Sequence, residues 1–125
     1  MPLTVDKVED VVVVTLNVEE FDAGNADDFK QEVAPVLQGC ARLVLDLNRV
    51  RFVDSSGCGA ILSCLKQATS GGGDVKLCRV QRPVRTTFEL IRLHRICEIF
   101  DTREEAVRAF HKGEPGASAP GGRSA

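Results

Sequence analysis

The stretch RFVDSSGCGAIL, from Arg51 to Leu62, places one acid and two hydroxyl side chains between two apolar segments. Apolar residues before Asp54 are typical of a strand end, and those after Ser56 recur at helical spacing. The pattern predicts a helix that begins at Ser56 and has Asp54 or Ser55 as its N-cap. A cap alone accounts for an acid or a serine at this point, so the rest of the chain must decide whether a hydroxyl here also reacts.

The glycines that follow allow two interpretations. Without side chains, Gly57 and Gly59 permit either tight packing of the helix or close approach of another molecule, and we expect both to leave the junction open to a large partner. A phosphate on Ser55 would be tolerated at a helix N-terminus. Beside Asp54, however, it would create a strongly negative patch. A partner fitted to the neutral hydroxyl would then be repelled.

Composition limits the possible functions. The 125 residues are 43% hydrophobic, which suits a single domain with its own core. Sixteen Lys and Arg stand against eighteen Asp and Glu, and the chain has neither Trp nor Tyr, so direct binding to nucleic acid is not expected. The longest apolar run, VVVVTL, is far shorter than the ~20 residues of a membrane span, and the N-terminus does not resemble a signal peptide. We therefore predict a cytoplasmic protein without membrane contact.

The cysteines indicate no metal or disulfide framework. Their number is odd, they are scattered, and no CxxC or Cys/His cluster occurs. We expect reduced thiols that pack as small apolar side chains and no bound cofactor. The five positions are Cys40, Cys58, Cys64, Cys78 and Cys97.

Strand and helix patterns alternate along the chain. The first two strands, joined by a short turn, should be antiparallel, and the alternation that follows predicts an α/β fold with a partly parallel sheet. Strands are expected at 3–10, 11–16, 41–47, 75–80 and 96–100, and helices at 25–38, 56–70, 82–94 and 101–110.

Several details of these helices can be predicted. Asn25 is placed to cap the first helix, and Pro35 should end or bend it near its C-terminus. Ile91 should face inward in the third helix. Thr102 and Glu105 have the spacing of a capping box at the start of the fourth.

Beyond Phe110 the composition changes. Residues 111–125 are almost entirely Gly, Pro, Ala, Ser and charged residues. We expect a folded domain over 1–110 and a disordered tail over 111–125.

Enzymatic alternatives fit the sequence poorly. The serines lack the leading glycine of a GxSxG elbow, and no convincing histidine and acid partners stand out. Asp46 lies near a strand end, as in phosphoacceptor receiver domains, but the accompanying acidic pair and lysine are not convincing. The serine of an acyl carrier protein would lie in an all-helical domain, and no Walker A loop is present. We predict that the chain is not an enzyme.

Several segments together resemble a known family. LVLDLNRVRFVDSSGCGAIL, GGDVKLCRV, VRTTFELIRLHRICEIFD and TREEAVRAF are similar to a STAS domain, and more narrowly to the free-standing bacterial anti-sigma-factor antagonists. The similarity covers about residues 3–110, and the DSSG junction is its most specific element. It implies a mixed sheet of four to five strands with about four helices packed against it.

The resemblance also implies a mechanism. Members bind an anti-sigma factor that is a GHKL-type serine kinase, which frees the sigma factor. The kinase phosphorylates the serine after the motif aspartate, which abolishes binding, and a PP2C-type phosphatase resets the switch. By this resemblance the phosphorylated residue is Ser55. The partner-binding residues are Asp22, Asp54, Ser56, Gly57, Cys58 and Gly59, and Lys66 and Gln67 are polar candidates on the helix that follows.

The chain departs from the family pattern at two places. It reads NVEEFD where the family often has a Gly-acid-Leu-Asp run, and Cys58 stands where Leu is usual. We expect Cys58 to face the core and not to act as a redox sensor. The alternative function is a STAS scaffold or accessory subunit, in a stress-signalling or transporter complex, without a phosphoswitch.

Overall fold

The computed structural model describes residues 1–39 and 42–112. Five strands form the main sheet, and two very short strands pair beside it. The main strands are β1 (Leu3–Val8), β2 (Val11–Leu16), β4 (Arg42–Asp46), β6 (Asp74–Cys78) and β7 (Ile99–Phe100). The short pair is β3 (Glu20–Phe21) and β5 (Phe52–Val53).

The sheet is mixed, as the sequence predicts. Its order is β1-β2-β4-β6-β7, in which β1 pairs antiparallel with β2 and the other neighbours are parallel. Four α-helices and one short 3-10 helix complete the fold. They are α1 (Ala26–Gly39), α2 (Ser55–Ser70), α3 (Arg82–Leu90), η1 (Leu93–Arg95) and α4 (Arg103–Lys112). The predicted α/β fold is confirmed.

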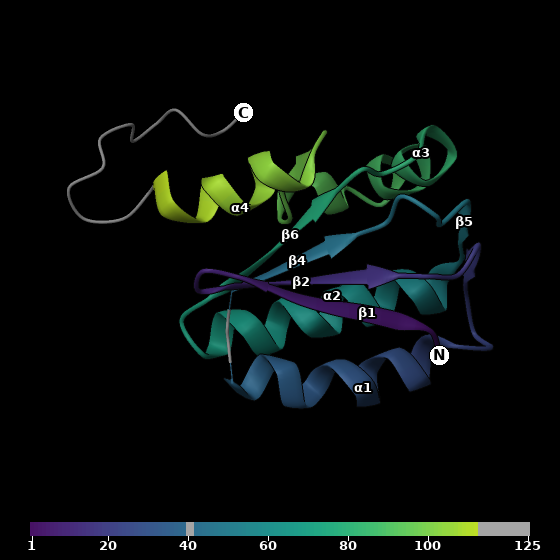
Figure 1. The fold of residues 1–125 in the computed structure, drawn as a ribbon. Helices are drawn as coiled ribbons and strands as arrows, with labels where there is room; N and C mark the ends of the chain where they lie inside the picture. Colours follow the sequence, from purple (N-terminus) through teal and green to yellow (C-terminus); the bar gives the residue numbers. More distant parts are fainter. Residues whose placement is uncertain (40–41, 113–125) are drawn as a thin grey trace.

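Helices cover both faces of the sheet. The helices α1 and α2 lie side by side under one face, and α4 lies across the other (Figure 1). Strand β2 is buried on both sides, so its alternate valines face different layers. Val12 and Val14 belong to the core with α1 and α2, whereas Val11 and Val13 pack with α4.

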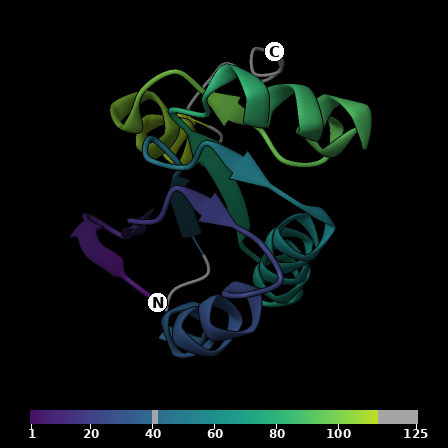
Figure 2. The same cartoon turned by 90° about the vertical axis from the view of Figure 1, so that its right-hand side faces the viewer.

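Strand ends determine where the loops gather. The C-terminal ends of the parallel strands β2, β4 and β6 lie at the same end of the sheet, and β3, β5 and α3 lie beyond that end (Figures 1 and 2). The short pair β3–β5 was not expected, because two residues carry too little pattern to identify a strand. It aligns the loop after β2 with the junction that leads into α2.

Two helices differ in part from prediction. Helix α1 covers nearly the expected range and does not end at Pro35 but runs through it to Gly39, so of the two predicted effects of this proline the ending is wrong. Helix α3 ends at Leu90, and Arg92 adopts a left-handed backbone conformation (φ 63°) that stops the predicted continuation to residue 94. Ile91 is therefore half exposed, and Leu93 takes the buried place.

Asp46 is fully buried at the end of β4, where two arginines reach it. Arg79 donates to both of its oxygens at 2.9–3.2 Å, and Arg103 of α4 donates at 3.0 Å. Burial alone would raise the pKa of Asp46, but hydrogen bonds from Arg79, the Asn48 amide and Arg103 hold it below its ordinary value. The carboxylate thereby connects α4 to the sheet, which is a structural role.

Four cysteines are buried and free, as expected; they are Cys58, Cys64, Cys78 and Cys97. Cys40 lies outside the described residues. Helix α4 extends two residues into the range that the sequence assigns to a tail, and the rest of that range, 113–125, also lies outside the described residues. None of the described helices is both long and apolar enough to cross a bilayer.

Candidate functional site

Asp54 is the N-cap of α2 and uses both carboxylate oxygens. Oδ1 accepts from the Gly57 amide at 3.0 Å, which satisfies one of the free donors of the first helical turn. Oδ2 accepts from the Ala23 amide at 3.1 Å, in the loop between β3 and α1. The sequence left Asp54 and Ser55 as possible caps, and the structure selects Asp54. One side chain therefore joins two loops that are distant in sequence.

The Asp22 loop lies against this junction. Its own carboxylate accepts from the Gly24 amide at 2.9 Å, and its backbone amide donates to Asn25 Oδ1 at 3.0 Å. Asn25 precedes α1 as predicted, but its side chain holds the loop instead of capping the helix. The β3–β5 pairing and the Asp54 bond to Ala23 bring this loop beside the start of α2. Asp22 and Asp54 thus belong to one surface.

The two serines are the first residues of α2, and both are exposed. Within the described residues neither hydroxyl forms a hydrogen bond, so each is available to solvent or to a partner. The amides of these first positions have no acceptor within the helix, and they point toward its positive end. Ser55 directly follows the capping carboxylate. The arrangement offers an unhindered hydroxyl in a region that tolerates added negative charge.

Comparison with known proteins identifies the family of the chain. The sequence model of the STAS domain family matches residues 2–106. The chain belongs to the STAS domain family. A protein of Bordetella bronchiseptica that carries the name anti-sigma factor antagonist BtrV is 32% identical to this STAS domain, over 92% of this chain and 99% of its own. The crystal structure of an anti-sigma factor antagonist candidate from Thermotoga maritima is 32% identical, with a TM-score of 0.82, over 87% of this chain and 94% of that one.

A more distant neighbour is SpoIIAA, a cell fate determinant of Bacillus, which has been solved in unphosphorylated and phosphorylated forms. The phosphorylated form is 20% identical to this STAS domain, with a TM-score of 0.67, over 86% of this chain and 98% of that one. At this identity the likeness concerns the fold alone.

The two glycines of the STAS junction have different roles. Gly57 is buried, and a Cβ atom there would lie 2.3 Å from the carbonyl oxygen of Phe21. Its lack of a side chain serves packing of α2 against β3, so the expectation that it keeps the surface open is wrong. Gly59 is exposed, and a Cβ there would meet nothing within 4 Å. Only Gly59 leaves open space above the helix.

Cys58 faces the core, as predicted. Its side chain is 5% exposed, and burial, followed by the nearby charge of Asp54, raises the pKa of its thiol. Both effects disfavour the reactive thiolate, and burial leaves little of the side chain for a partner to contact. Lys66 and Gln67 are exposed on α2, where a partner could reach them.

Sequence reasoning missed Phe52, which lies just before the junction and is 52% exposed. In the two-residue strand β5 its neighbour Val53 faces inward, so alternation turns Phe52 outward. Had β5 been recognised as a strand, its alternation would have predicted that Phe52 faces solvent. The phenyl ring adds an apolar element to a mostly polar surface.

One group of side chains in the described part of the chain could in principle hold a metal ion: Glu9, Asp10 and His111. It lies at the β1–β2 turn, at the end of the sheet opposite β5, the strand that leads into α2 (Figure 1). Asp10 already binds Arg42 at 2.8 Å and His111 at 2.6 Å. These ion pairs account for the cluster without a metal.

Proposed function

We propose that this chain binds, in its unphosphorylated form, an anti-sigma factor that is also a serine kinase, and so releases a sigma factor. Phosphorylation of Ser55 abolishes the binding, and a phosphatase of the PP2C type restores it. The chain supplies the acceptor hydroxyl and the docking surface, whereas ATP and Mg²⁺ belong to the kinase. The proposal extends the family membership and the names of the relatives to this chain's own partner.

One observation carries the proposal. Ser55 presents a hydroxyl that bonds to none of the described residues, at the first position of α2 and directly beside a carboxylate whose two oxygens accept from the Gly57 and Ala23 amides. A kinase can reach this hydroxyl without unfolding the helix. The resulting phosphate carries about −1.5 to −2 charges at neutral pH. Because Asp54 holds both loops in place, the added charge alters what a partner meets and not the fold.

The chemistry follows from this position. Ser55 Oγ forms a bond to the γ-phosphorus of ATP, ADP leaves, and the hydroxyl proton passes to a base on the kinase. The free amides at the helix N-terminus stabilise the phosphate on Ser55, by at most about 2 kcal/mol. Asp54 opposes it by like-charge repulsion. A partner that contacts Asp22 and Phe52 then meets a phosphate dianion on Ser55, where it would otherwise meet a hydroxyl.

The test uses the full chain, a purified GHKL-type anti-sigma kinase from the same genome, and ATP. We expect the intact mass to rise by one phosphate in the wild type and in Ser56→Ala, and to stay unchanged in Ser55→Ala. Ser55→Ala should still bind the kinase, since it keeps a neutral surface. Ser55→Glu should bind at least about tenfold more weakly, a loss of roughly 1.4 kcal/mol.

Three outcomes would contradict the proposal. An unchanged mass of the wild type with a kinase that binds it would favour the scaffold or accessory-subunit function. A phosphate on Ser56 would move the modified position by one residue. Equal binding of Ser55→Ala and Ser55→Glu would show that charge at this position does not control the partner.

A further inference from the structure

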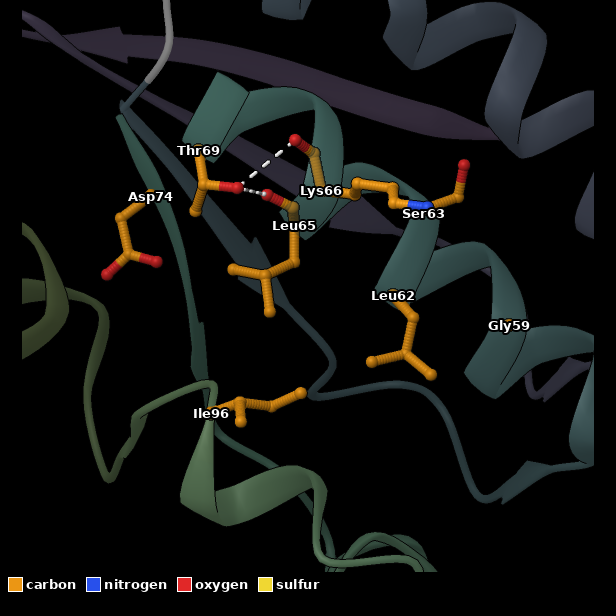
Figure 3. A pocket seen from close by; sticks show the side chains of 8 residues that line it. All are labelled: Gly59, Leu62, Ser63, Leu65, Lys66, Thr69, Asp74 and Ile96. Atoms are coloured by element: carbon orange, nitrogen blue, oxygen red, sulfur yellow. Dashed lines mark hydrogen bonds between the residues drawn. The ribbon is translucent and has the colours of Figure 1, made fainter. Parts of the chain in front are cut away.

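A second surface lies beyond the Ser55 junction, between α2 and η1. It is a hollow of about 650 Å³. We call it the α2–η1 groove. It is lined by Gly59, Leu62, Ser63, Leu65, Lys66, Thr69, Asp74 and Ile96. Figure 3 shows the side chains of Leu62, Leu65 and Ile96 pointing into this space from its two sides.

Apolar residues are unusually exposed along this groove. Leu62 is 38% exposed and Ile96 is 58% exposed, and both line the hollow. Leu90 and Ile91, which do not line the hollow but shortly precede η1 in the chain, are 79% and 49% exposed at the end of α3. Clustered exposed apolar side chains of this kind typically mark an interaction site.

The two elements that border the groove, α2 and η1, carry exposed cations. Lys66 lines the groove from α2, Arg92 directly precedes η1, and Arg95 is the last residue of η1, next to the lining residue Ile96. All three are exposed, and in the described part of the chain they form no ion pair. The neighbouring acids are already engaged. Asp74 and Glu98 both bind Lys76, at 3.2 and 2.6 Å. The four cations Lys66, Lys76, Arg92 and Arg95 outnumber the two acids, so the charge of this region is positive, although the whole chain is slightly acidic.

We propose that the α2–η1 groove binds an amphipathic helix of a partner protein whose apolar stripe is flanked by Asp and Glu. Apolar side chains at i, i+3 or i+4, and i+7 would enter between Leu62 and Ile96, as in other helix-in-groove contacts. Acidic side chains on its two flanks would meet Lys66 on one side and Arg92 and Arg95 on the other. Gly59 and Lys66 belong to both this groove and the surface expected to bind the kinase, but Ser55 does not line the groove, so helix binding does not require its hydroxyl.

Other classes of partner fit less well. An apolar concavity suits the ridge of a helix, whereas a bilayer requires apolar side chains that protrude together. Nucleic acid would need stacking aromatics or a wider basic surface, and no aromatic side chain lines the groove. The shape and the two cationic edges thus favour an acidic helix.

The test titrates the full ¹⁵N-labelled chain with a synthetic helical peptide of about 18 residues that has a leucine stripe and glutamate flanks. A matched peptide replaces every glutamate by lysine. With the acidic peptide, but not with the lysine peptide, we expect saturable chemical-shift changes of the backbone amides from Leu62 to Thr69 and from Arg92 to Ile96. The affinity should fall as salt rises from 20 to 200 mM, by roughly threefold or more.

Variants sharpen the test. Arg92→Glu combined with Arg95→Glu should weaken the acidic peptide at least about tenfold and favour the lysine peptide. Ile96→Ser, at an exposed position, should weaken binding of the acidic peptide through the lost apolar contact. Arg108→Glu, an exposed charge reversal on α4, is the matched control and should change nothing. Thermal unfolding confirms that each variant is folded.

Four results would overturn the proposal: absence of saturable shifts, equal affinity for the two peptides, shifts that map to α1 or α4, or unaltered binding by the Arg92/Arg95 double variant. Sedimentation with phosphatidylserine vesicles addresses the membrane alternative. Binding to these vesicles without binding to the acidic peptide would likewise overturn it. Because the kinase takes no part, failure here leaves the Ser55 proposal intact.

Discussion

Gly57 and Gly59 are chemically identical and two residues apart, yet they should respond oppositely to alanine. A Cβ at Gly57 would lie 2.3 Å from the Phe21 carbonyl oxygen and 2.8 Å from Val53. Gly57→Ala must therefore displace β3 from α2, and we expect a loss of about 1–3 kcal/mol in the free energy of unfolding. Gly59→Ala meets open space in a helix and should gain about 0.5–1 kcal/mol.

Urea unfolding at pH 7 measures both changes under one set of conditions. Wild-type stability in Gly57→Ala would contradict the close contact with Phe21. Destabilisation of Gly59→Ala would indicate that something covers this face of the free protein.

Asp54 should matter more than an ordinary cap because it serves two loops. Asp54→Ala removes the bonds to the Gly57 and Ala23 amides, so we expect a loss of about 1–3 kcal/mol, above that of a typical cap. Asp54→Asn retains one acceptor oxygen and should lose less. Ser55→Ala is the control and should change stability by less than about 0.5 kcal/mol, since its hydroxyl bonds to nothing in the described chain. Equal losses in Asp54→Ala and Asp54→Asn would show that only one of the two bonds matters.

The sequence predicted that the acid and the two serines stand at the start of a helix, because a cap before a helix has a local signature. It did not predict the bond to Ala23, the burial of Gly57 or the exposure of Phe52. These features depend on the β3–β5 pairing, and two-residue strands leave no periodicity to detect. The long-range part of the site therefore required the structure.

Helix α4 depends on Asp46 for its attachment to the sheet. Its folded-state pKa is below its unfolded value, so its contribution to stability is complete above about pH 4 and is lost as pH falls through the folded pKa. Asp46→Asn should be less stable by about 1–3 kcal/mol at pH 7. It should also show a smaller loss of stability between pH 4 and pH 2 than the wild type.

Chemical unfolding from pH 7 to pH 2 tests this dependence. Asp101→Asn, at an exposed position, is the control and should follow the wild type. A variant of Asp46 with the wild-type acid profile would rule out the ion cluster as the source of the dependence.

The elements themselves were largely predictable from their periodicity, and the errors have local causes. Ile91 continues the helical spacing of Val84 and Phe88, but Arg92 turns the chain into the left-handed region and exposes it. A positive φ at an arginine has no sequence signature. Pro35 lies late in α1, and the helix continues for four residues despite the missing donor.

The folded protein should protect its four buried thiols from alkylation until it unfolds. Burial raises the pKa of Cys64, Cys78 and Cys97 to about 12 in each case, so hardly any reactive thiolate exists at pH 8. In a Cys40→Ser background, we expect iodoacetamide to label these three residues and Cys58 only at the rate of unfolding. Peptide mapping against time in native buffer and in urea gives that rate. Complete labelling of any of the four within seconds in native buffer would contradict the packing described.

The contact between His111 and Asp10 has a practical consequence. It fixes the end of α4 at the β1–β2 turn, whereas β5, which leads into α2 and its first residue Ser55, lies at the other end of the sheet (Figure 1). A protein captured on a sensor chip through a label at the end of α4 would present Ser55 and the Asp54 junction to the flowing analyte. Capture near Phe52 or Asp22 would instead turn that surface toward the chip, and the same kinase would then give a false negative.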